Sequence, residues 1–466
     1  MALSKIWSAF IIIAIAVAGF KAAFFSDSKT IFSTMVTGKS GDTIKIRSFQ
    51  TATTSQGEMP ILDSNGRGVL GNASAIQYKD GSVLVYKKQE ADGLIQTCIN
   101  AVNLCLGLIG FMAFFMGLMK IAENAGGVRF LSKIIGPFFS RIFPEIPKGH
   151  PSMGHMTLNF SANLLGLDNA ATPFGIKAME SLQELNPNKA VASNPQIMFL
   201  CLHASGLTLI PVSIIALRSA AGADNPMDIF IPCMIATFVA TIAALFIVSF
   251  KQKINLLQPV IFGWIAGISA IIAAMVVYIK SLDTESVKLF SGNLSGGLIL
   301  LIILAIILGG IYKKIDIFDG FVEGAKGGFE TAVKIIPYLV GMLVAISLLR
   351  TSGSFDILIN GMKSLFALFG ADTRFVDGLP TALIKPFSGG GARGMMVDTM
   401  AVQGPDSFAG RLSCILQGSS DTTFYVIAVY FGAVSVKNTR YAVGAMLLAD
   451  AVGIVTSVLL CYLFFG

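Results

Sequence analysis

Long apolar runs recur along the whole chain, and they restrict its fold more than any other feature. About 20 consecutive apolar residues are enough to carry a helix across a bilayer. The 466-residue sequence supplies runs of this length repeatedly between residues 6 and 465. Only 13% of the residues are charged, whereas a soluble domain has about 25%. The sequence therefore predicts an all-α, polytopic membrane protein.

Lysine and arginine gather in the short connections between the apolar runs. This pattern is typical of cytoplasmic loops and explains the net charge of +7 without a nucleic-acid partner. The first run, residues 6–25, follows Lys5 and could be read as a signal peptide. Because no small-residue cleavage site precedes a polar segment, we expect an uncleaved span with its N-terminus in the cytoplasm.

Residues 26–92 differ from the rest of the chain, because they are polar and rich in Ser, Thr and Gly. Residues 43–47 and 83–86 have the residue types of strands, and residues 65–66 and 80–81 have those of turns. We expect a small β-rich extracytoplasmic insert. The alternative is a partly ordered loop.

The remaining sequence contains one order of segments twice: a span, an amphipathic helix, a polar hairpin, a broken span and a span. In the first copy these are residues 94–121, 128–143, 153–184, 196–217 and 227–250. In the second copy they are residues 332–349, 355–369, 380–400, 411–434 and 439–464. Because an odd number of crossings separates the copies, we predict two inverted-topology repeats, an arrangement typical of transporters.

This order divides the chain into five predicted parts. They are a first transmembrane helix (1–25), the extracytoplasmic insert (26–92), a first gate-like repeat (93–255), linking transmembrane helices (256–315) and a second gate-like repeat (316–466).

The first hairpin is too short and too polar in its middle to cross the membrane twice, so we predict that it is re-entrant, and that its counterpart in the second copy is too. Backbone at membrane depth must be bonded by protein or line a watery cavity. The first turn is expected at residues 166–173, where Asp168 or Asn169 can cap the second half-helix and Pro173 fits its first turn. The second turn is expected at residues 387–394. Half-helix N-termini at such turns favour anionic or polar ligands.

Polar residues of the two hairpins and the two broken spans are expected to surround one central site for a substrate or ion. The candidates are Asn163, Asp168, Asn169, Thr172, His203, Ser205, Ser388, Arg393, Gln417, Ser419, Ser420, Asp421 and Thr422.

Asp421 is the sharpest candidate, because a carboxylate inside a membrane is costly and usually functional. It could bind Na⁺, a proton or a polar solute, or it could pair with Arg393 or cap a half-helix. His203 could relay protons or be a hydrogen-bonded packing residue. Asn163 and Asn169 could equally tie hairpin backbone together. Arg393 could bind an anionic group or extend its charge to water.

No cofactor, metal site or catalytic residue is predicted. The G-x-G-x-x-G pattern at residues 389–394 does not follow a strand of a βαβ unit. The spacing of His150, His155 and His203 does not fit a zinc site. No nucleophile and base stand out as a pair, so we do not expect an enzyme.

Several motifs resemble a known family. The segments GLMKIAE (117–123), FPEIP (143–147), HPSMG (150–154) and NAATPFGIKAME (169–180) closely resemble spore maturation protein A. The segments GAKGGF (324–329), IPYLV (336–340), PFSGGGARG (386–394) and QGSSDTTFY (417–425) resemble spore maturation protein B. The chain looks like a fusion of the two. The resemblance implies the nucleoside-recognition gate domain, which is similar to domains of concentrative nucleoside transporters and of ferrous iron transport protein B.

Together these observations predict a secondary transporter of the bacterial plasma (inner) membrane. The expected cargo is a small polar solute, nucleoside-like or a small anion, moved with H⁺ or Na⁺ through a midplane site. The alternatives are a non-transporting membrane scaffold in envelope or spore maturation, and a metal-ion permease. The expected partners are the lipid bilayer, the solute and, as one possibility, further copies of the same chain.

Overall fold

Helices dominate the protein. The computed structural model describes residues 2–25, 29–38, 61–62, 67–70, 73–77, 83–86, 93–164, 168–206, 208, 211–282, 284–370 and 372–466. Within this part, seven helices contain stretches that are long and apolar enough to cross a membrane. These stretches are Trp7–Phe24, Leu94–Asn124, Phe230–Gln252, Pro259–Ile279, Asn293–Lys313, Ile317–Thr351 and Ala442–Phe465. The expected helical, multi-pass architecture is confirmed.

The first helix, α1 (Ala2–Phe24), packs against the second half of the chain. The Trp7 indole donates to the Gly341 carbonyl over 2.9 Å, and the Lys21 amine donates to the Ser352 carbonyl over 2.8 Å. This first span is therefore anchored to a helix more than 300 residues away in the sequence.

Four short strands form one antiparallel sheet in the order β1-β2-β3-β4. They are β1 (Ile61–Leu62), β2 (Arg67–Leu70), β3 (Ala73–Gln77) and β4 (Val83–Tyr86). The strand expected at residues 83–86 is thus β4, whereas residues 43–47 and both expected turns lie outside the described residues. The short helix α2 (Ile31–Thr37) also falls within the predicted insert, where the sequence suggested only strands and turns.

The first half of the helical body runs from α3 to α9. Its helices are α3 (Leu94–Asn124), α4 (Gly127–Ile142), α5 (Pro151–Leu164), α6 (Asp168–Leu185), α7 (Asn194–Ala204), α8 (Val212–Ala220) and α9 (Phe230–Gln252). Helices α5 and α6 pack side by side as a hairpin. Helix α6 already begins at Asp168. Pro173 therefore lies in its second turn, whereas the sequence predicted the first turn. The predicted broken span 196–217 is interrupted between α7 and α8, and Pro211 directly precedes α8.

The second half follows two linking helices, α10 (Pro259–Lys280) and α11 (Thr284–Lys313). Its elements are α12 (Ile317–Thr351), α13 (Ser354–Ala367), η2 (Arg374–Asp377), α14 (Pro380–Ile384), α15 (Gly389–Gln403), α16 (Phe408–Gly418), α17 (Thr423–Val426), η3 (Ile427–Phe431) and α18 (Ala442–Phe465).

Two boundaries in this half differ from the prediction. Helix α12 begins at Ile317, well before the expected residue 332. Residues 389–394 form the first turns of α15, although their glycines suggested a turn. Ser388 explains the second difference, because its hydroxyl accepts a bond from the Gly391 N–H over 2.9 Å and so caps the helix.

Corresponding helices in the two halves begin in the same way. A glycine in the left-handed conformation precedes α4 (Gly126, φ 81°) and α13 (Gly353, φ 74°). A serine caps α7 (Ser193) and α16 (Ser407), and each hydroxyl accepts a bond from a backbone N–H three residues later. The two halves thus share local folding signals as well as the order of their elements.

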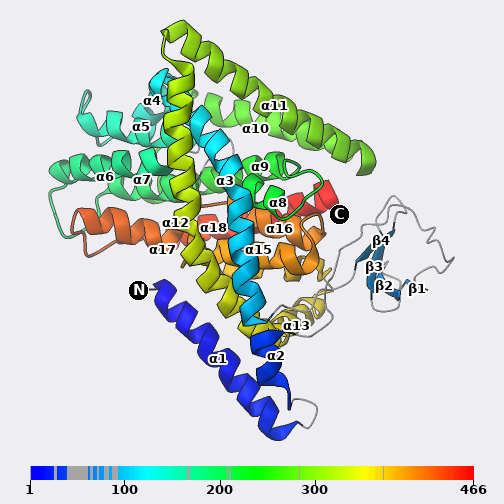
Figure 1. Ribbon diagram of the computed structural model, residues 1–466. Helices are drawn as coiled ribbons and strands as arrows, with labels where there is room; N and C mark the ends of the chain where they lie inside the picture. The colour runs from blue at the N-terminus through cyan, green and yellow to red at the C-terminus, as the bar shows by residue number, and fades with distance from the viewer. Residues whose placement is uncertain are drawn as a thin grey trace.

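The two longest helices of the halves, α3 and α12, cross at close range (Figure 1). A side chain at Gly324 would lie 2.4 Å from the Met116 carbonyl oxygen, and one at Gly328 would lie 2.6 Å from that of Met112. Since higher numbers on α12 face lower numbers on α3, the helices are antiparallel here. Small residues four positions apart are typical of close helix contacts in membranes.

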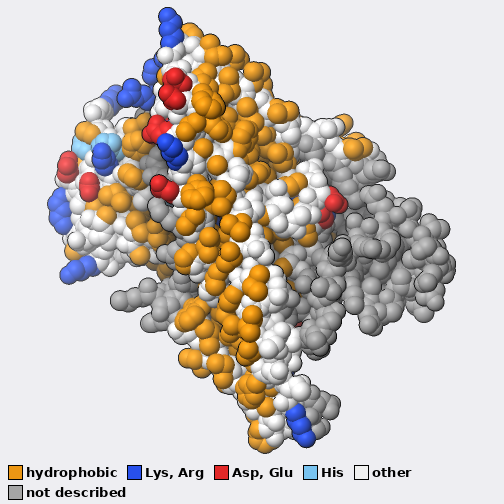
Figure 2. Space-filling view, viewed as in Figure 1, with side chains coloured by type: hydrophobic (Ala, Val, Ile, Leu, Met, Phe, Trp, Pro, Cys, Tyr) orange, Lys and Arg blue, Asp and Glu red, His pale blue; other side chains and the backbone are white. Residues whose placement is uncertain are grey.

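Buried residues of both halves share the same cores. One core cluster includes Ile215 of α8 and Leu412 of α16, and a second includes Leu200 of α7 and Tyr430 of η3. Figure 2 shows apolar side chains covering much of the face formed by α11, α12 and α3, with most charged side chains along the upper-left and left edge of this view. This distribution is the one a bilayer requires of the surface that it touches.

Candidate functional site

The two broken helices meet at their breaks. Ser205 and Ser419 follow α7 and α16, and each hydroxyl donates to the carbonyl three residues earlier, over 2.6 and 2.9 Å. Gly206 has a φ of 64°, and a side chain there would lie 3.1 Å from the Asp421 nitrogen. The Asp421 N–H donates to the Ala204 carbonyl over 2.7 Å. The break in one half therefore satisfies a carbonyl at the helix end of the other half.

The second hairpin is attached to the same break. The Phe424 N–H donates to the Pro386 carbonyl over 2.9 Å, and the rings of Phe387 and Phe424 are stacked with centroids 5.1 Å apart. The Lys385 amine donates to the Gln417 carbonyl. Lys385 is only 5% exposed. A buried cation therefore stands at the point where hairpin and broken helix join.

The first hairpin contributes two asparagines that contact His203 of α7. The imidazole Nδ1 lies 3.0 Å from the Asn159 Oδ1 and 2.9 Å from the Asn163 Nδ2. The other ring nitrogen, Nε2, lies 3.9 Å from the Asp421 Oδ2. The Tyr430 ring packs edge-on against the imidazole, with centroids 4.8 Å apart.

A cavity of about 550 Å³ lies where these elements come together. This volume falls within the range of small-molecule sites. The predicted site residues that line it are Asn163, His203, Arg393, Gln417, Ser420, Asp421 and Thr422. The structure thus places polar residues from both halves around one cavity.

The other candidates lie elsewhere or are not described. The Ser205 hydroxyl also contacts that of Thr241 over 3.0 Å, so Ser205, like Ser388 and Ser419, is used at a helix end and does not line the cavity. Thr172 hydrogen-bonds the Tyr430 hydroxyl. The side chains of Asp168 and Asn169 lie outside the described residues.

One wall of the cavity carries a charged cluster on α3 and α12. The Lys120 amine lies 3.5 Å from a carboxylate oxygen of Glu123 and 3.3 Å from one of Glu323. All three residues line the cavity, together with Gly324 and Gly327 of α12. The close helix crossing therefore also forms part of the cavity wall.

Two buried charged residues near the site were not among the candidates. Lys385 lines the cavity, and Asp450, which is 5% exposed, accepts a bond from the Thr423 hydroxyl over 2.5 Å. Each stands alone between apolar residues in the sequence. An isolated charge within an apolar segment was the signal that could have identified both.

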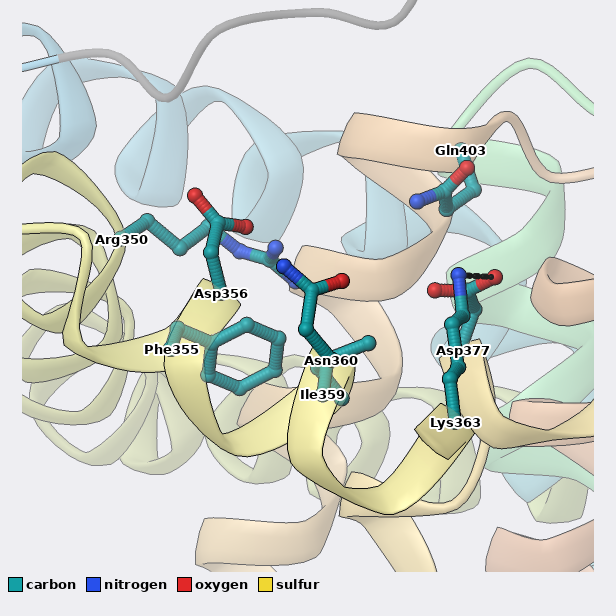
Figure 3. A pocket seen from close by; sticks show the side chains of 8 residues that line it. All are labelled: Arg350, Phe355, Asp356, Ile359, Asn360, Lys363, Asp377 and Gln403. Atoms are coloured by element: carbon teal, nitrogen blue, oxygen red, sulfur yellow. Dashed lines mark ion pairs between the residues drawn. The ribbon is translucent and has the colours of Figure 1, made fainter. Parts of the chain in front are cut away.

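A second, smaller cavity of about 250 Å³ lies between α12, α13, η2 and α15 (Figure 3). Two of its charged groups are paired locally, because the Arg350 guanidinium contacts Asp398 and the Lys363 amine lies 2.8 Å from Asp377. The central cavity is the larger of the two and is lined by polar residues of both halves. We therefore regard the central cavity as the candidate site.

Within the described part of the chain, no cluster of three or more His, Cys, Asp or Glu side chains could hold a metal ion. The features above define a class: a multi-pass membrane protein whose polar cavity is built from two interrupted helices and two short helical hairpins. Comparison with protein families assigns the chain more narrowly. The Gate family, described as nucleoside recognition, matches residues 105–221 and 332–437, and each matched region contains one of the two helix breaks.

Two relatives from Bacillus subtilis (strain 168) match different parts of the chain. Spore maturation protein B is 49% identical over 173 residues, which cover 37% of this chain and 96% of that protein. Spore maturation protein A is 45% identical over 147 residues, which cover 32% of this chain and 75% of that protein. No solved structure matches the chain. The chain belongs to the Gate family of membrane proteins, and the predicted resemblance to a fusion of spore maturation proteins A and B is confirmed.

Proposed function

We propose that the protein carries a small polar solute across the bacterial plasma membrane through the central cavity. The observation that carries this proposal is the cavity itself, which places Lys385, His203 and Asp421 between helix breaks of a multi-pass membrane protein. Broken helices and buried charges are costly at membrane depth and are typical of transport sites. Nucleoside recognition in the family description supports a transporter-like role.

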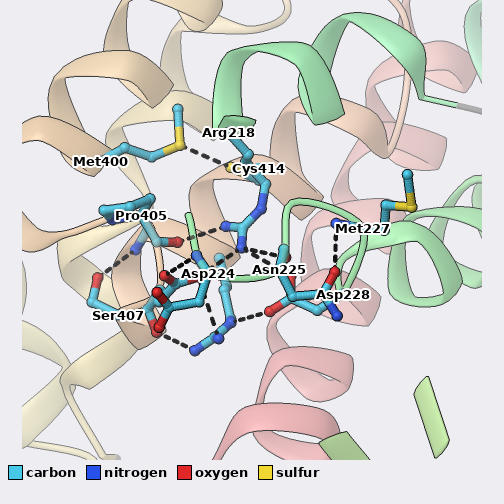
Figure 4. A network of polar contacts seen from close by, with 12 residues as sticks. Arg218, Asp224, Asn225, Met227, Asp228, Met400, Pro405, Ser407 and Cys414 are labelled. Carbon is cyan, nitrogen blue, oxygen red and sulfur yellow. Dashed lines mark hydrogen bonds and ion pairs between the residues drawn. The ribbon is translucent and has the colours of Figure 1, made fainter. Parts of the chain in front are cut away.

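The two halves are proposed to be inverted-topology repeats, with α5–α6 and α14–α15 as re-entrant hairpins. Three observations support this: α3 and α12 are antiparallel, the helix caps correspond, and the loops pair reciprocally. The Ala192 N–H before α7 donates to the Asn438 carbonyl before α18 over 2.9 Å. At the other pair of loops, the Asp224 N–H donates to the Asp406 carboxylate over 2.8 Å (Figure 4). Each loop before a broken helix thus meets the loop after the other one.

The proposed repeats are residues 93–255 and 316–466, with the linking helices between them. In this proposal the N-terminus is cytoplasmic and residues 26–92 are extracytoplasmic. Protease accessibility of a tag at each position tests the orientation, and a tag in residues 39–60 that is cleaved only from the cytoplasm would reverse it.

The substrate class is proposed to be a nucleoside-like compound or a small anion. Lys385 and Arg393 suit an anionic group, and the side chains of Asn163 and Gln417 suit the polar edges of a base. Transport is proposed to be coupled to H⁺ or Na⁺ through Asp421, the carboxylate between the two breaks. The mechanism then alternates access to one fixed cavity by movement of one repeat against the other.

Uptake by purified protein in liposomes tests this function. The panel contains nucleosides, bases, small carboxylates and divalent cations, with imposed H⁺ or Na⁺ gradients. We expect gradient-driven uptake, and we expect Asp421→Asn to lower it about 5- to 150-fold, as for the loss of a typical coupling free energy. Asp356→Asn is the control, because that exposed carboxylate lines the other cavity and should leave uptake unchanged. Undiminished uptake by folded Asp421→Asn protein would rule out the role of Asp421.

A membrane scaffold in spore or envelope maturation is the second candidate, and the names of the two relatives favour it. A scaffold needs no solute flux. Protein that is folded, takes up no compound of the panel and is recovered from cells with a stoichiometric protein partner would support the scaffold over the transporter.

A further inference from the structure

His203 has a hydrogen-bond donor and an acceptor at the same ring nitrogen. Asn159 holds its own orientation, because its Nδ2 donates to the Ala171 carbonyl over 2.7 Å and its Oδ1 therefore faces the imidazole. Asn163 directs its Nδ2 at the same Nδ1 atom over 2.9 Å. A histidine with a purely structural role needs only one kind of partner at this atom, since the neutral ring either donates or accepts there.

The two asparagines match the two protonation states of the ring. When the imidazole is neutral with its proton on Nε2, the bare Nδ1 accepts a bond from Asn163. When the ring is an imidazolium, Nδ1–H donates to the Asn159 Oδ1. In both states Nε2–H faces the Asp421 carboxylate, 3.9 Å away. His203 can therefore gain and lose a proton with its side chain in place.

Several polar and charged groups surround His203 or share its cavity. Asp421 lies on the break after α16, and the Tyr430 hydroxyl belongs to the ring that packs edge-on against the imidazole. Lys385 and Arg393 line the same cavity and oppose a second cation, whereas the Glu123 and Glu323 carboxylates of the cavity wall are paired with Lys120. His203 is 5% exposed, so its charged form depends on the Asp421 carboxylate beside it.

We propose that His203 and Asp421 together bind the coupling ion, and that this ion is a proton. Asn159 and Asn163 are positioning residues: Asn159 stabilises the protonated ring of His203, and Asn163 stabilises the neutral ring. Na⁺ is a hard cation that takes oxygen ligands, and the imidazole nitrogen opposite the carboxylate is not a suitable ligand for it. The coupling role rests on the transport function proposed above, whereas the binding of the proton does not.

Proton binding at this pair changes the charge of the cavity by one unit. With a neutral imidazole the Asp421 carboxylate faces the cavity uncompensated by His203, and with an imidazolium the two charges cancel. A solute that is bound beside Asp421 therefore meets a different field in each state, and this difference is what couples the two ligands.

Nitrogen NMR of protein labelled with ¹⁵N-histidine tests proton binding without any transport. The chain has three histidines, His150, His155 and His203, and His203→Gln assigns the signals of the third. We expect His203 to lose its neutral Nδ1 signal as the pH falls. Asp421→Asn should shift the titration midpoint to lower pH by about one unit, because the carboxylate favours the charged ring. Asn163→Ala should shift it the other way, because Asn163 stabilises the neutral ring.

Each result decides between the alternatives. A His203 that stays neutral wherever the protein is folded, or a midpoint that Asp421→Asn leaves unchanged, would overturn the proposal. The control Asp356→Asn should leave the titration midpoint of His203 unchanged. An equal shift in that variant would mean that the net charge of the protein sets the midpoint, and it would contradict a specific pair of His203 and Asp421. A titrating His203 in a protein that transports nothing refutes only the transport function. Sodium-driven uptake with a His203 that does not titrate refutes only the proton site.

Discussion

At the scale of the residue, the protein places charged side chains inside an apolar body and gives each a specific partner. The Lys385 amine donates to a backbone carbonyl of the broken helix α16, and Asp450 of α18 accepts from Thr423 directly after the break. Unpartnered, each would cost several kcal/mol at membrane depth. The partners lie on both sides of the α16 break, so these two charges hold the break in its conformation.

Thr423→Val tests this role. The change keeps the size of the side chain and removes the hydroxyl that bonds Asp450 over 2.5 Å, so we expect the free energy of unfolding to fall by about 1–3 kcal/mol. Denaturant titration in detergent micelles measures it. The double change Thr423→Val with Asp450→Leu removes both polar partners and should recover part of the loss. A double variant that loses at least the sum of the single changes would contradict the argument.

The sequence identified Asp421 and His203 because both stand in clusters of polar residues within otherwise apolar spans. Lys385 and Asp450 were not among its candidates, although each is an isolated charge in an apolar segment. Their partners, 32 and 27 residues away, could not be matched from the sequence. The sequence also could not predict which of the serines line a cavity. Ser205 and Ser420 look equivalent there, and only the folded backbone turns one to a helix end and the other to the cavity.

At the scale of the element, the breaks were predictable and the close contacts were not. Proline disfavours the interior of a helix, and Pro211 indicates the interruption of the span at residues 196–217 through local backbone chemistry alone. The start of α12 was missed because glycine has low helix propensity. In the fold, Gly324 and Gly328 are required by the approach of α3, so packing between helices outweighs the local preference.

Gly328→Ala and its neighbour Gly327→Ala separate these effects. A methyl group at residue 328 would meet the Met112 carbonyl oxygen at 2.6 Å, whereas one at residue 327 meets only the Met116 methyl at 3.9 Å. We expect Gly328→Ala to destabilise the protein by about 1–3 kcal/mol. Gly327→Ala should be neutral or stabilise by about 0.5–1 kcal/mol, because alanine favours a helix. Thermal unfolding of both variants gives the comparison, and equal effects would exclude close packing as the cause.

At the scale of the whole molecule, the two halves are joined by a buried ionic network (Figure 4). Arg218 and Asp228 come from the first half, and Asp406 and Arg411 come from the second. Arg218 lies 2.9 Å from Asp228 and 3.0 Å from Asp406, and Arg411 lies 2.7 Å from Asp228. The paired residues from opposite halves are 183 and 188 positions apart. A single sequence could not match them, because Arg218 in the last turn of α8 and Arg411 in the first turn of α16 could each pair with many carboxylates.

Arg218→Ala should therefore be strongly destabilising. The change removes a cation that is 0% exposed and leaves Arg411 as the cation beside both Asp228 and Asp406. Loss of one partner from a buried network costs about 3–5 kcal/mol. Lys363→Ala is the matched control, since its pair with Asp377 is partly exposed and local and should cost about 1 kcal/mol or less. Chemical unfolding in micelles compares them. Similar losses in both variants would mean that the network does not hold the halves together.

The hydrogen bond from the Asp421 N–H to the Ala204 carbonyl has a consequence for how such proteins are made. The cavity is complete only when one half presents its break to the other, and in this chain a peptide tether fixes their stoichiometry at one to one. The tether also keeps the halves at a high effective concentration, so they can associate even if each contact between them is weak. Relatives that match one half each and exist as separate chains have no such guarantee. If they build the same cavity, they must do so as subunits, and unequal synthesis would leave the surplus subunit with an unfinished site.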